Sequence, residues 1–360
     1  MSKEYEIEVI AQPSLYKPKD RTLRIYFSEP DAGIHENTGI LLLISGYGGQ
    51  ANSNVYKKMR SQFSDTYNLV TVQCNYFGWE YMQSNTDIRI TGDMLEKTLT
   101  EEEKKLLLTD FNTNKHIFRE KTIDINMQLN ETLENMNDMG PVQAIDQLTA
   151  LKVVTDIILQ NGLVFNKKKI VLYGFSHGGY ISYLCNALMP GVVTTIIDNS
   201  AYVFPSNLNY NRTLMWQEEA GYNVCIIYDY LIKNIVFDKD IYDLNYLYER
   251  QNSNVKVISF HGLNDTMAPI KDKLVFLEKI SNSICEVIDE NRIDGDMFNS
   301  TKHGLGADFL KLYDYAERKY GSESEREGLQ FGSHIIETEK CKYFICFDDE
   351  IPLLKYEMKR

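Results

Sequence analysis

One short segment has the residue types and the spacing of a nucleophile. Residues 174–178 read GFSHG and match the pattern G-x-S-x-G. The segment follows an apolar run at 169–173 that predicts a strand, and it opens a helical pattern at 178–188. In a sharp strand-to-helix turn the serine hydroxyl stands clear of the strand, and the flanking glycines leave room for it. We therefore predict that Ser176 is a nucleophile rather than an inert serine in a glycine-rich turn.

A serine hydroxyl is a weak nucleophile, so it needs a base to take its proton and an acid to orient that base. Around this type of turn the chain order is serine, then aspartate or glutamate, then histidine. His303 follows the last core strand in a flexible loop and is the predicted base. Asp265 lies in the loop after the strand at 255–260 and is the predicted acid, since catalytic groups gather at the carboxyl ends of parallel strands.

Other histidines and acids compete for these roles. His261 directly follows a strand, and we interpret it as a structural residue that is hydrogen-bonded near the strand end. His334 belongs to an alternating, strand-like tail. Asp294 and Asp296 are the competing acids, although an Asp-Gly pair at 294–295 is also typical of a tight turn.

Acyl chemistry also needs hydrogen-bond donors for the negative charge that develops on the carbonyl oxygen. One donor is expected from the backbone N–H of the residue after the nucleophile, here His177. The other is expected from the loop after the third strand, which reads SGYGG at 45–49. We favour the N–H of Tyr47 and consider that of Gly48 next, with a plain glycine turn as the alternative.

The elements that must position these residues alternate between strands and helices. Strands are predicted at 5–11, 22–27, 40–44, 68–76, 169–173, 192–197, 255–260 and 285–288, and helices at 52–66, 141–159, 178–188, 271–280 and 305–315. This alternation predicts an α/β fold with a mostly parallel sheet and helices on both faces.

Two long segments, 84–139 and 202–252, interrupt this pattern, and we expect them to be insertions in one domain at 1–320. A linker and a β-prone tail are expected at 321–360. The second insertion is rich in aromatic residues, which we interpret as the core of a helical cap over the nucleophile rather than as a dedicated aromatic cage. Within this cap, Arg212, Trp216 and Arg250 are the predicted substrate-binding residues.

Composition limits the classes of function. The chain has 360 residues, a formal net charge of −13 and a pI near 5.0, which argues against binding of nucleic acid or anionic membranes. The six cysteines form no CxxC pair, as expected in a reducing compartment. We find no apolar leader at the N-terminus and no apolar run long enough to span a membrane, so we expect a soluble, cytoplasmic protein.

Motifs for other chemistry are missing from the sequence. It contains no HExxH, Walker A or EF-hand motif, and its six histidines are scattered. The GYGG run at 46–49 lacks the full G-x-G-x-x-G spacing of a dinucleotide site. We therefore expect neither a metal nor a cofactor, and a small molecule or glycan as the substrate.

At this level of detail the sequence resembles the α/β-hydrolases and, among them, a bacterial family of unknown function. The matching segments are 140–150 (GPVQAIDQLTA), 174–201, 261–269 and 293–306. Genes of that family often lie beside genes for flagellin glycosylation with sialic-acid-like sugars, so the resemblance implies acyl transfer or deacylation on a sugar. The resemblance also implies that Ser176, Asp265 and His303 are the nucleophile, the acid and the base. The sequence DNS at 198–200 also matches, but the resemblance assigns it no role.

These observations predict a serine esterase or O-acyltransferase that works through an acyl-enzyme on an acylated sugar or a small ester. Two alternatives remain open at this stage. One is a peptidase with the same fold, and the other is a catalytically silent binding protein in glycan assembly.

Overall fold

The computed structural model describes residues 2–83, 92–217, 221–251, 253–348 and 351–359. The chain divides into two compact units. The first comprises Met1–Gln83, Leu133–Pro205 and Phe237–Arg360, and the second comprises Ser84–Thr132 and Ser206–Val236. Among the described residues, no helix is long and apolar enough to cross a bilayer.

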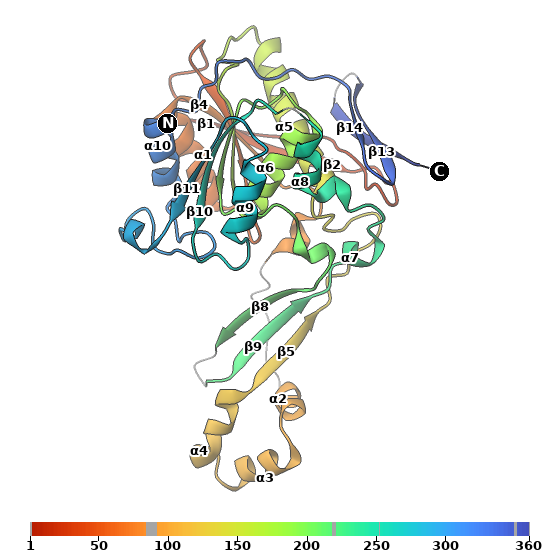
Figure 1. The fold of residues 1–360 in the computed structure, drawn as a ribbon, viewed down its shortest axis with the longest axis vertical. Helices are drawn as coiled ribbons and strands as arrows, with labels where there is room; N and C mark the ends of the chain where they lie inside the picture. The colour runs from red at the N-terminus through yellow and green to blue at the C-terminus, as the bar shows by residue number, and fades with distance from the viewer. Residues whose placement is uncertain (1, 84–91, 218–220, 252, 349–350, 360) are drawn as a thin grey trace. The chain divides into compact units, whose positions relative to one another are not determined.

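The first unit is built on an eight-stranded sheet (Figure 1). Its strands run in the order β1 (Lys3–Ile10), β2 (Thr22–Glu29), β4 (Leu69–Cys74), β3 (Gly39–Ile44), β6 (Ile170–Phe175), β7 (Thr195–Asn199), β10 (Lys256–Gly262) and β11 (Ser283–Ile288). The pairs β1–β2 and β2–β4 are antiparallel. All the other neighbouring pairs, from β4–β3 to β10–β11, are parallel. The mostly parallel sheet expected from the sequence is confirmed.

Helices cover both faces of this sheet. One face carries α1 (Asn54–Tyr67) and α10 (Phe309–Tyr320), whose apolar side chains share a core cluster with alternate residues of the central strands. The other face carries α5 (Pro141–Gln160) and α6 (His177–Leu188), which pack side by side, together with α8 (Leu244–Glu249) and α9 (Ile270–Leu277) (Figure 1). Because both faces are covered, every residue of β3, β4 and β7 is buried.

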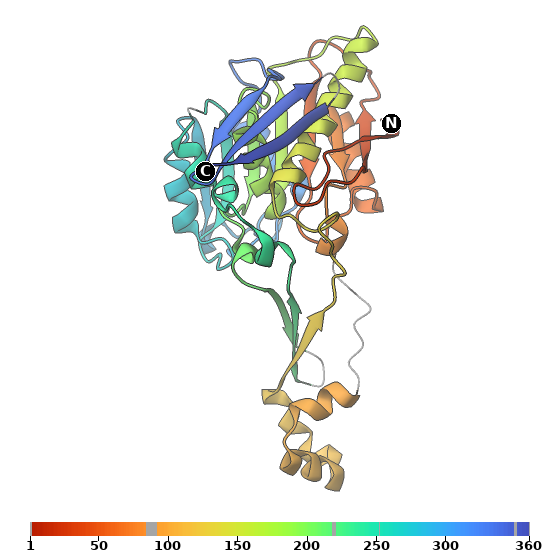
Figure 2. The same cartoon turned by 90° about the vertical axis from the view of Figure 1, so that its right-hand side faces the viewer.

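A second, smaller sheet follows at the C-terminal end of the chain. It consists of β12 (His334–Glu337), β13 (Cys341–Asp348) and β14 (Ile351–Met358), all antiparallel, and β14 packs against α5 (Figure 2). The Gln12 side chain bonds both backbone groups of Leu354 at 2.7 and 3.2 Å. The segment 321–333, which leads into this sheet, is hydrogen-bonded as well, since the Gly328 amide donates to the Lys167 carbonyl. These bonds join the tail to the rest of the first unit.

The second unit contains a three-stranded sheet rather than the helical cap expected from the sequence. Its strand β9 (Asn223–Tyr228) pairs parallel with β5 (Thr122–Met127) and antiparallel with β8 (Arg212–Gln217). Its helical elements are α2 (Gly92–Thr98), α3 (Glu101–Thr109), α4 (Phe111–Asn114), η2 (Lys115–Glu120), η3 (Ser206–Leu208) and α7 (Ile232–Ile235). Aromatic and β-branched residues fit a pleated strand as well as a helical core, which explains the error. Residues 237–251, with η4 (Asp240–Tyr242) and α8, belong to the first unit instead.

Candidate active site

Ser176 stands at the tight turn between β6 and α6. Its backbone has φ 53° and ψ −115°, a conformation that costs free energy for a residue with a side chain. The two glycines of the pattern make the turn possible. A Cβ on Gly174 would lie 2.3 Å from the backbone of Gly178, and one on Gly178 would lie 2.1 Å from the carbonyl oxygen of Ile44. The strand, the turn and the helix expected from the sequence are therefore all present around this serine.

His303 lies beside the serine. Its Nε2 is 2.8 Å from Ser176 Oγ, and its Nδ1 is 2.8 Å from Asp265 Oδ2. A carboxylate only accepts hydrogen bonds, so Nδ1 carries the ring proton and Nε2 is left to accept the serine proton. The structure thus brings together Ser176, His303 and Asp265, which stand far apart in the sequence. The His303 side chain is 15% exposed, whereas that of Asp265 is fully buried.

The Asp265 carboxylate is held from the other side by its own loop. Its Oδ1 accepts the amides of Met267 and Ala268, each at 2.9 Å. Burial raises the pKa of Asp265, but the hydrogen bonds from His303 and from the Ala268 amide outweigh burial, so the pKa lies below its ordinary value. The carboxylate is consequently charged at neutral pH and keeps His303 in one tautomer.

His261 lies behind this carboxylate and has a different environment. Its Nε2 lies 2.6 Å from the Ala268 carbonyl, to which it donates, and 3.6 Å from Asp265 Oδ2. Burial, followed by the nearby charge of Lys273, lowers the pKa of His261. Lys273 is itself buried and paired with Asp198, 3.3 Å away. A neutral, fully buried His261 braces the loop that holds the acid.

The competing acids Asp294 and Asp296, and His334, make contacts outside the Ser176–His303–Asp265 chain. Asp294 Oδ1 accepts the amides of Asp296, Met297 and Phe298 at 2.8–2.9 Å, so it caps a tight turn. Asp296 pairs with Lys311, and His334 begins β12. The hydrogen bonds of His303 given above go to neither of these acids.

The loop after β3 differs from the expectation in one respect. The Gly48 amide donates to the Met82 carbonyl at 2.9 Å, so it is not directed toward an oxyanion, and the second choice made from the sequence is wrong. Gly48 has φ 79°, a left-handed conformation that glycine adopts readily. Tyr47 stays the predicted donor in this loop. The Tyr47 hydroxyl lies 3.0 Å from Met139 Sδ, and its ring meets the His177 ring edge to face at 5.4 Å.

The residue after the serine is anchored by its side chain. His177 is fully buried, and its Nε2 lies 2.6 Å from Gln143 Oε1 while its Nδ1 bonds the Tyr202 hydroxyl. Gln143 Nε2 donates to the Phe77 carbonyl at 3.0 Å, which leaves Oε1 as the acceptor for His177. His177 therefore carries its proton on Nε2 and is held in place at the first turn of α6. First-turn amides of a helix point out of its N-terminus, where they suit an anion.

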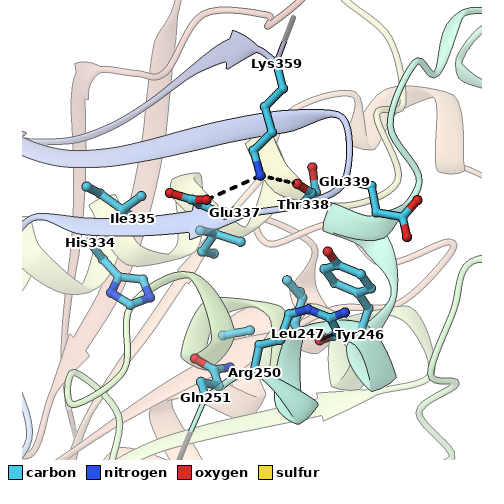
Figure 3. Close-up of a pocket in the computed structure, with 12 residues that line it drawn as sticks. Tyr246, Leu247, Arg250, Gln251, His334, Ile335, Glu337, Thr338, Glu339 and Lys359 are labelled. Carbon is cyan, nitrogen blue, oxygen red and sulfur yellow. Dashed lines mark hydrogen bonds and ion pairs between the residues drawn. The ribbon is translucent and has the colours of Figure 1, made fainter.

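The three predicted substrate-binding residues are divided between the two units of the structure. Arg212 lies in β8 of the second unit, with its guanidinium 5.4 Å from the Tyr228 ring centroid. The side chain of Trp216, in the same strand, lies outside the described part of the structure. Arg250 belongs to the first unit and stacks on Tyr246 at 3.5 Å, in a pocket between α8 and β12 (Figure 3).

This pocket lies far from the serine. It is lined by Ala187, near the C-terminal end of α6, whereas Ser176 precedes the first residue of that helix. At about 1.5 Å per residue, the two ends of α6 are roughly 15 Å apart. The structure thus does not bring Arg250 to Ser176, because α8 packs beside the far end of α6.

Several polar residues around the site were not assigned a role from the sequence. Asn199 and Ser200 lie at the end of β7, and Gln143 and Tyr202 hold His177. The motif DNS at 198–200 was the available signal for the first pair. Gln143 lies in the matching segment 140–150, which was given no role, and no pattern pointed to Tyr202. Among the described residues, no group of three or more His, Cys, Asp or Glu side chains could hold a metal ion.

Comparisons with solved structures find hydrolases that are similar to this chain at low sequence identity. Acylaminoacyl peptidase from Pyrococcus horikoshii matches with a TM-score of 0.50 and 11% identity, over 91% of this chain and 43% of the other. This chain thus spans less than half of that enzyme. Est1E from Butyrivibrio proteoclasticus matches with a TM-score of 0.43 and 12% identity, over 86% and 97% of the two chains. Esterase 2 from Thermogutta terrifontis matches with a TM-score of 0.46 and 14% identity, over 88% of this chain and 97% of the other.

Strand order, helix placement and the serine turn together define an α/β-hydrolase fold. Residues 82–218 and 214–315 match the family model described as "Protein of unknown function (DUF2920)". These segments cover more than half of the chain, and the protein belongs to this family. None of the curated proteins matches the sequence.

Proposed function

We propose that this protein is a serine hydrolase that forms an acyl-enzyme on Ser176. One observation carries the proposal: the hydrogen-bonded chain from Ser176 Oγ through His303 to Asp265, with the serine at a strained turn between β6 and α6. A hydroxyl in this arrangement can lose its proton to a neighbouring base as it attacks. The bland alternative, an inert serine in a turn, does not require a histidine and a buried carboxylate in line with it.

The proposed reaction has two halves. Ser176 Oγ attacks the acyl carbonyl carbon while its proton moves to His303 Nε2, and Asp265 balances the charge on the ring. The backbone amides of His177 and Tyr47 are the proposed donors to the oxyanion. Collapse of this intermediate breaks the bond to the alcohol, which leaves with the proton from His303. Water, or a sugar hydroxyl, then gives its proton to His303 and attacks the carbonyl carbon of the acyl-enzyme. When this second intermediate collapses, the bond from the acyl carbon to Ser176 Oγ breaks and Oγ takes the proton back from His303.

The proposed substrate is an acylated sugar or a small ester, which makes the protein an esterase or an O-acyltransferase. This choice rests on the resemblance to the bacterial family linked with flagellin glycosylation, and the fold alone does not determine a substrate. A peptidase is the runner-up reading. Turnover of p-nitrophenyl esters, O-acylated nonulosonic sugars and peptide anilides, each compared between the wild type and Ser176→Ala, distinguishes these activities.

The proposal is tested by labelling with a fluorophosphonate probe. Ser176→Ala keeps the backbone of the turn but removes the attacking oxygen, so both labelling and ester turnover should be lost. Asp294→Asn, a change outside the proposed site, serves as the matched control and should label like the wild type. Labelling that persists in Ser176→Ala would overturn the proposal.

A further inference from the structure

The end of strand β7 carries two buried polar side chains that take no part in the proposed chemistry. Asn199 and Ser200 are both 0% exposed. Burying an amide and a hydroxyl costs free energy unless each finds hydrogen-bond partners. The partners of these two side chains therefore indicate what they hold in place.

Both side chains bond the backbone of the same residue, Gly304. Ser200 Oγ accepts the Gly304 amide at 3.0 Å, and Asn199 Nδ2 donates to the Gly304 carbonyl at 3.1 Å. Ser200 Oγ also donates to Asn199 Oδ1 at 2.9 Å, which closes a ring of hydrogen bonds. Asn199 is fixed in one orientation, because a flipped amide would place its Oδ1 against the Gly304 carbonyl, acceptor against acceptor. We call this pair of side chains the β7 clamp.

Gly304 directly follows the proposed base, His303. It has φ 78°, and a Cβ at this position would come within 2.8 Å of the Phe175 ring, so the loop packs closely on the residue before the serine. The same strand end also holds the serine, since the Ser176 amide donates to the Asn199 carbonyl at 2.8 Å. The β7 clamp thus connects the backbones that carry the proposed nucleophile and the proposed base.

Ser200 adopts a conformation that a residue with a side chain seldom takes. Its φ is 59°, and its amide donates to the Phe260 carbonyl in β10 at 2.9 Å. Left-handed backbone in a non-glycine residue persists only where its surroundings hold it. Here the strained backbone brings the hydroxyl to the Gly304 amide.

We infer that Asn199 and Ser200 are positioning residues that set the separation between His303 Nε2 and Ser176 Oγ. This inference rests on the proposed function. The clamp acts through the backbone of Gly304 and neither donates nor accepts the reacting proton. Its removal should let the histidine loop shift while Ser176 and its turn stay in place, and a shift of about 1 Å is enough to slow a proton transfer strongly.

Ser200→Ala tests the clamp most simply, because it removes only the hydroxyl. We expect the rate constant of fluorophosphonate labelling to fall roughly 10- to 100-fold, with an unchanged circular dichroism spectrum. Ser64→Ala is the matched control. Ser64 is also fully buried, and its hydroxyl bonds the Ser28 carbonyl and Thr71 Oγ1, in the β2, α1 and β4 region. This control should label at the wild-type rate.

A double-mutant comparison separates positioning from a general loss of structure. In a His303→Ala background, measured with excess probe, Ser200→Ala should cause no further slowing, since the clamp acts only through His303. A similar slowing in both backgrounds would overturn the inference. If Ser200→Ala does not fold, Asn199→Ala is measured in the same way.

The wild type separates failure of the inference from failure of the proposed function. If the wild type is labelled at Ser176, and Ser200→Ala and Asn199→Ala are labelled as fast as the wild type, the inference is wrong and the proposed function stands. If no fluorophosphonate labels the wild type, the proposed function is wrong, and the inference falls with it.

Discussion

Asp265 binds His303 with one carboxylate oxygen and its own loop with the other. Oδ2 lies 2.8 Å from His303 Nδ1, while Oδ1 accepts the amides of Met267 and Ala268 at 2.9 Å each. The two oxygens are therefore not interchangeable. The side that faces the loop needs an acceptor, and the side that faces His303 sets which ring nitrogen carries the proton.

This relationship predicts the effect of Asp265→Asn. The amide oxygen should keep the two loop bonds, so the amide NH₂ would face His303 Nδ1 and make it an acceptor. The proton would move to Nε2, which could no longer accept the proton of Ser176. We expect ester turnover to fall roughly 10³–10⁴-fold with little change in stability.

The competing acids supply the controls for this variant. Asp294→Asn should destabilise a turn, and Asp296→Asn should remove an exposed ion pair, but both should keep turnover within about threefold of the wild type. If either variant is more damaging to turnover than Asp265→Asn, the assignment of the acid is wrong.

The second prediction concerns the loop after β3. We propose the Tyr47 amide, not its hydroxyl, as an oxyanion donor, and that hydroxyl lies 3.0 Å from Met139 Sδ. Tyr47→Phe should thus change kcat by less than about threefold. A loss of 10²–10³, the usual cost of removing an oxyanion donor, would show that the hydroxyl performs this function instead.

The third prediction concerns the two arginines that the sequence analysis assigned to substrate binding, Arg212 and Arg250. Arg250 stacks on Tyr246 in a pocket at the far end of α6. Arg250→Ala should therefore leave turnover of p-nitrophenyl acetate and of an acylated nonulosonic sugar unchanged. The same two substrates test Arg212→Ala, for which we predict a loss with the anionic sugar only. A selective loss in Arg250→Ala would contradict this placement.

The fourth prediction concerns acid stability. Glu286 on β11 is 8% exposed, and burial raises its pKa, but hydrogen bonds from Lys319, Tyr320 and Arg292 outweigh this and lower it to about 2. A carboxyl whose pKa falls on folding stabilises the protein above its unfolded pKa of 4.5, and this contribution is lost as the pH falls toward 2. Glu286→Gln should cost about 2 kcal/mol at neutral pH, allowing for solvent screening.

Urea denaturation at about pH 7 and about pH 2 measures this effect. The difference in unfolding free energy between the wild type and Glu286→Gln should shrink at the lower pH. Glu327→Gln, a change at an exposed position, should have no effect at either pH. An equal loss at both values would mean that Glu286 stabilises by packing rather than by charge.

The sequence predicted the central sheet and the serine turn well, because both depend on local patterns. Short buried runs such as β3 and the glycines around Ser176 constrain the backbone wherever they occur. Chain order then selected Asp265 and His303, which the structure brings into hydrogen-bond contact with each other and, through His303, with the serine. Their catalytic roles stay predictions.

The features that the sequence missed depend on distant partners. The Gly48 amide is occupied by the carbonyl of Met82, 34 residues later, and no spacing rule reports that bond. The location of Arg250 follows from where α8 packs on α6. Residues 212–217 and 223–228 form strands because β9 pairs with β8 and with β5, which comes from the other insertion. In each case tertiary contact, not local preference, determined the outcome.

The most direct test of the proposed chemistry is fluorophosphonate labelling of the wild-type protein, followed by mass spectrometry of its peptides. We predict one labelled residue, Ser176, with no labelling in Ser176→Ala and ester turnover reduced roughly 10⁴–10⁶-fold in that variant. A wild-type protein that stays unlabelled, or a label on any other residue that persists in Ser176→Ala, would contradict the assignment of Ser176 as the nucleophile.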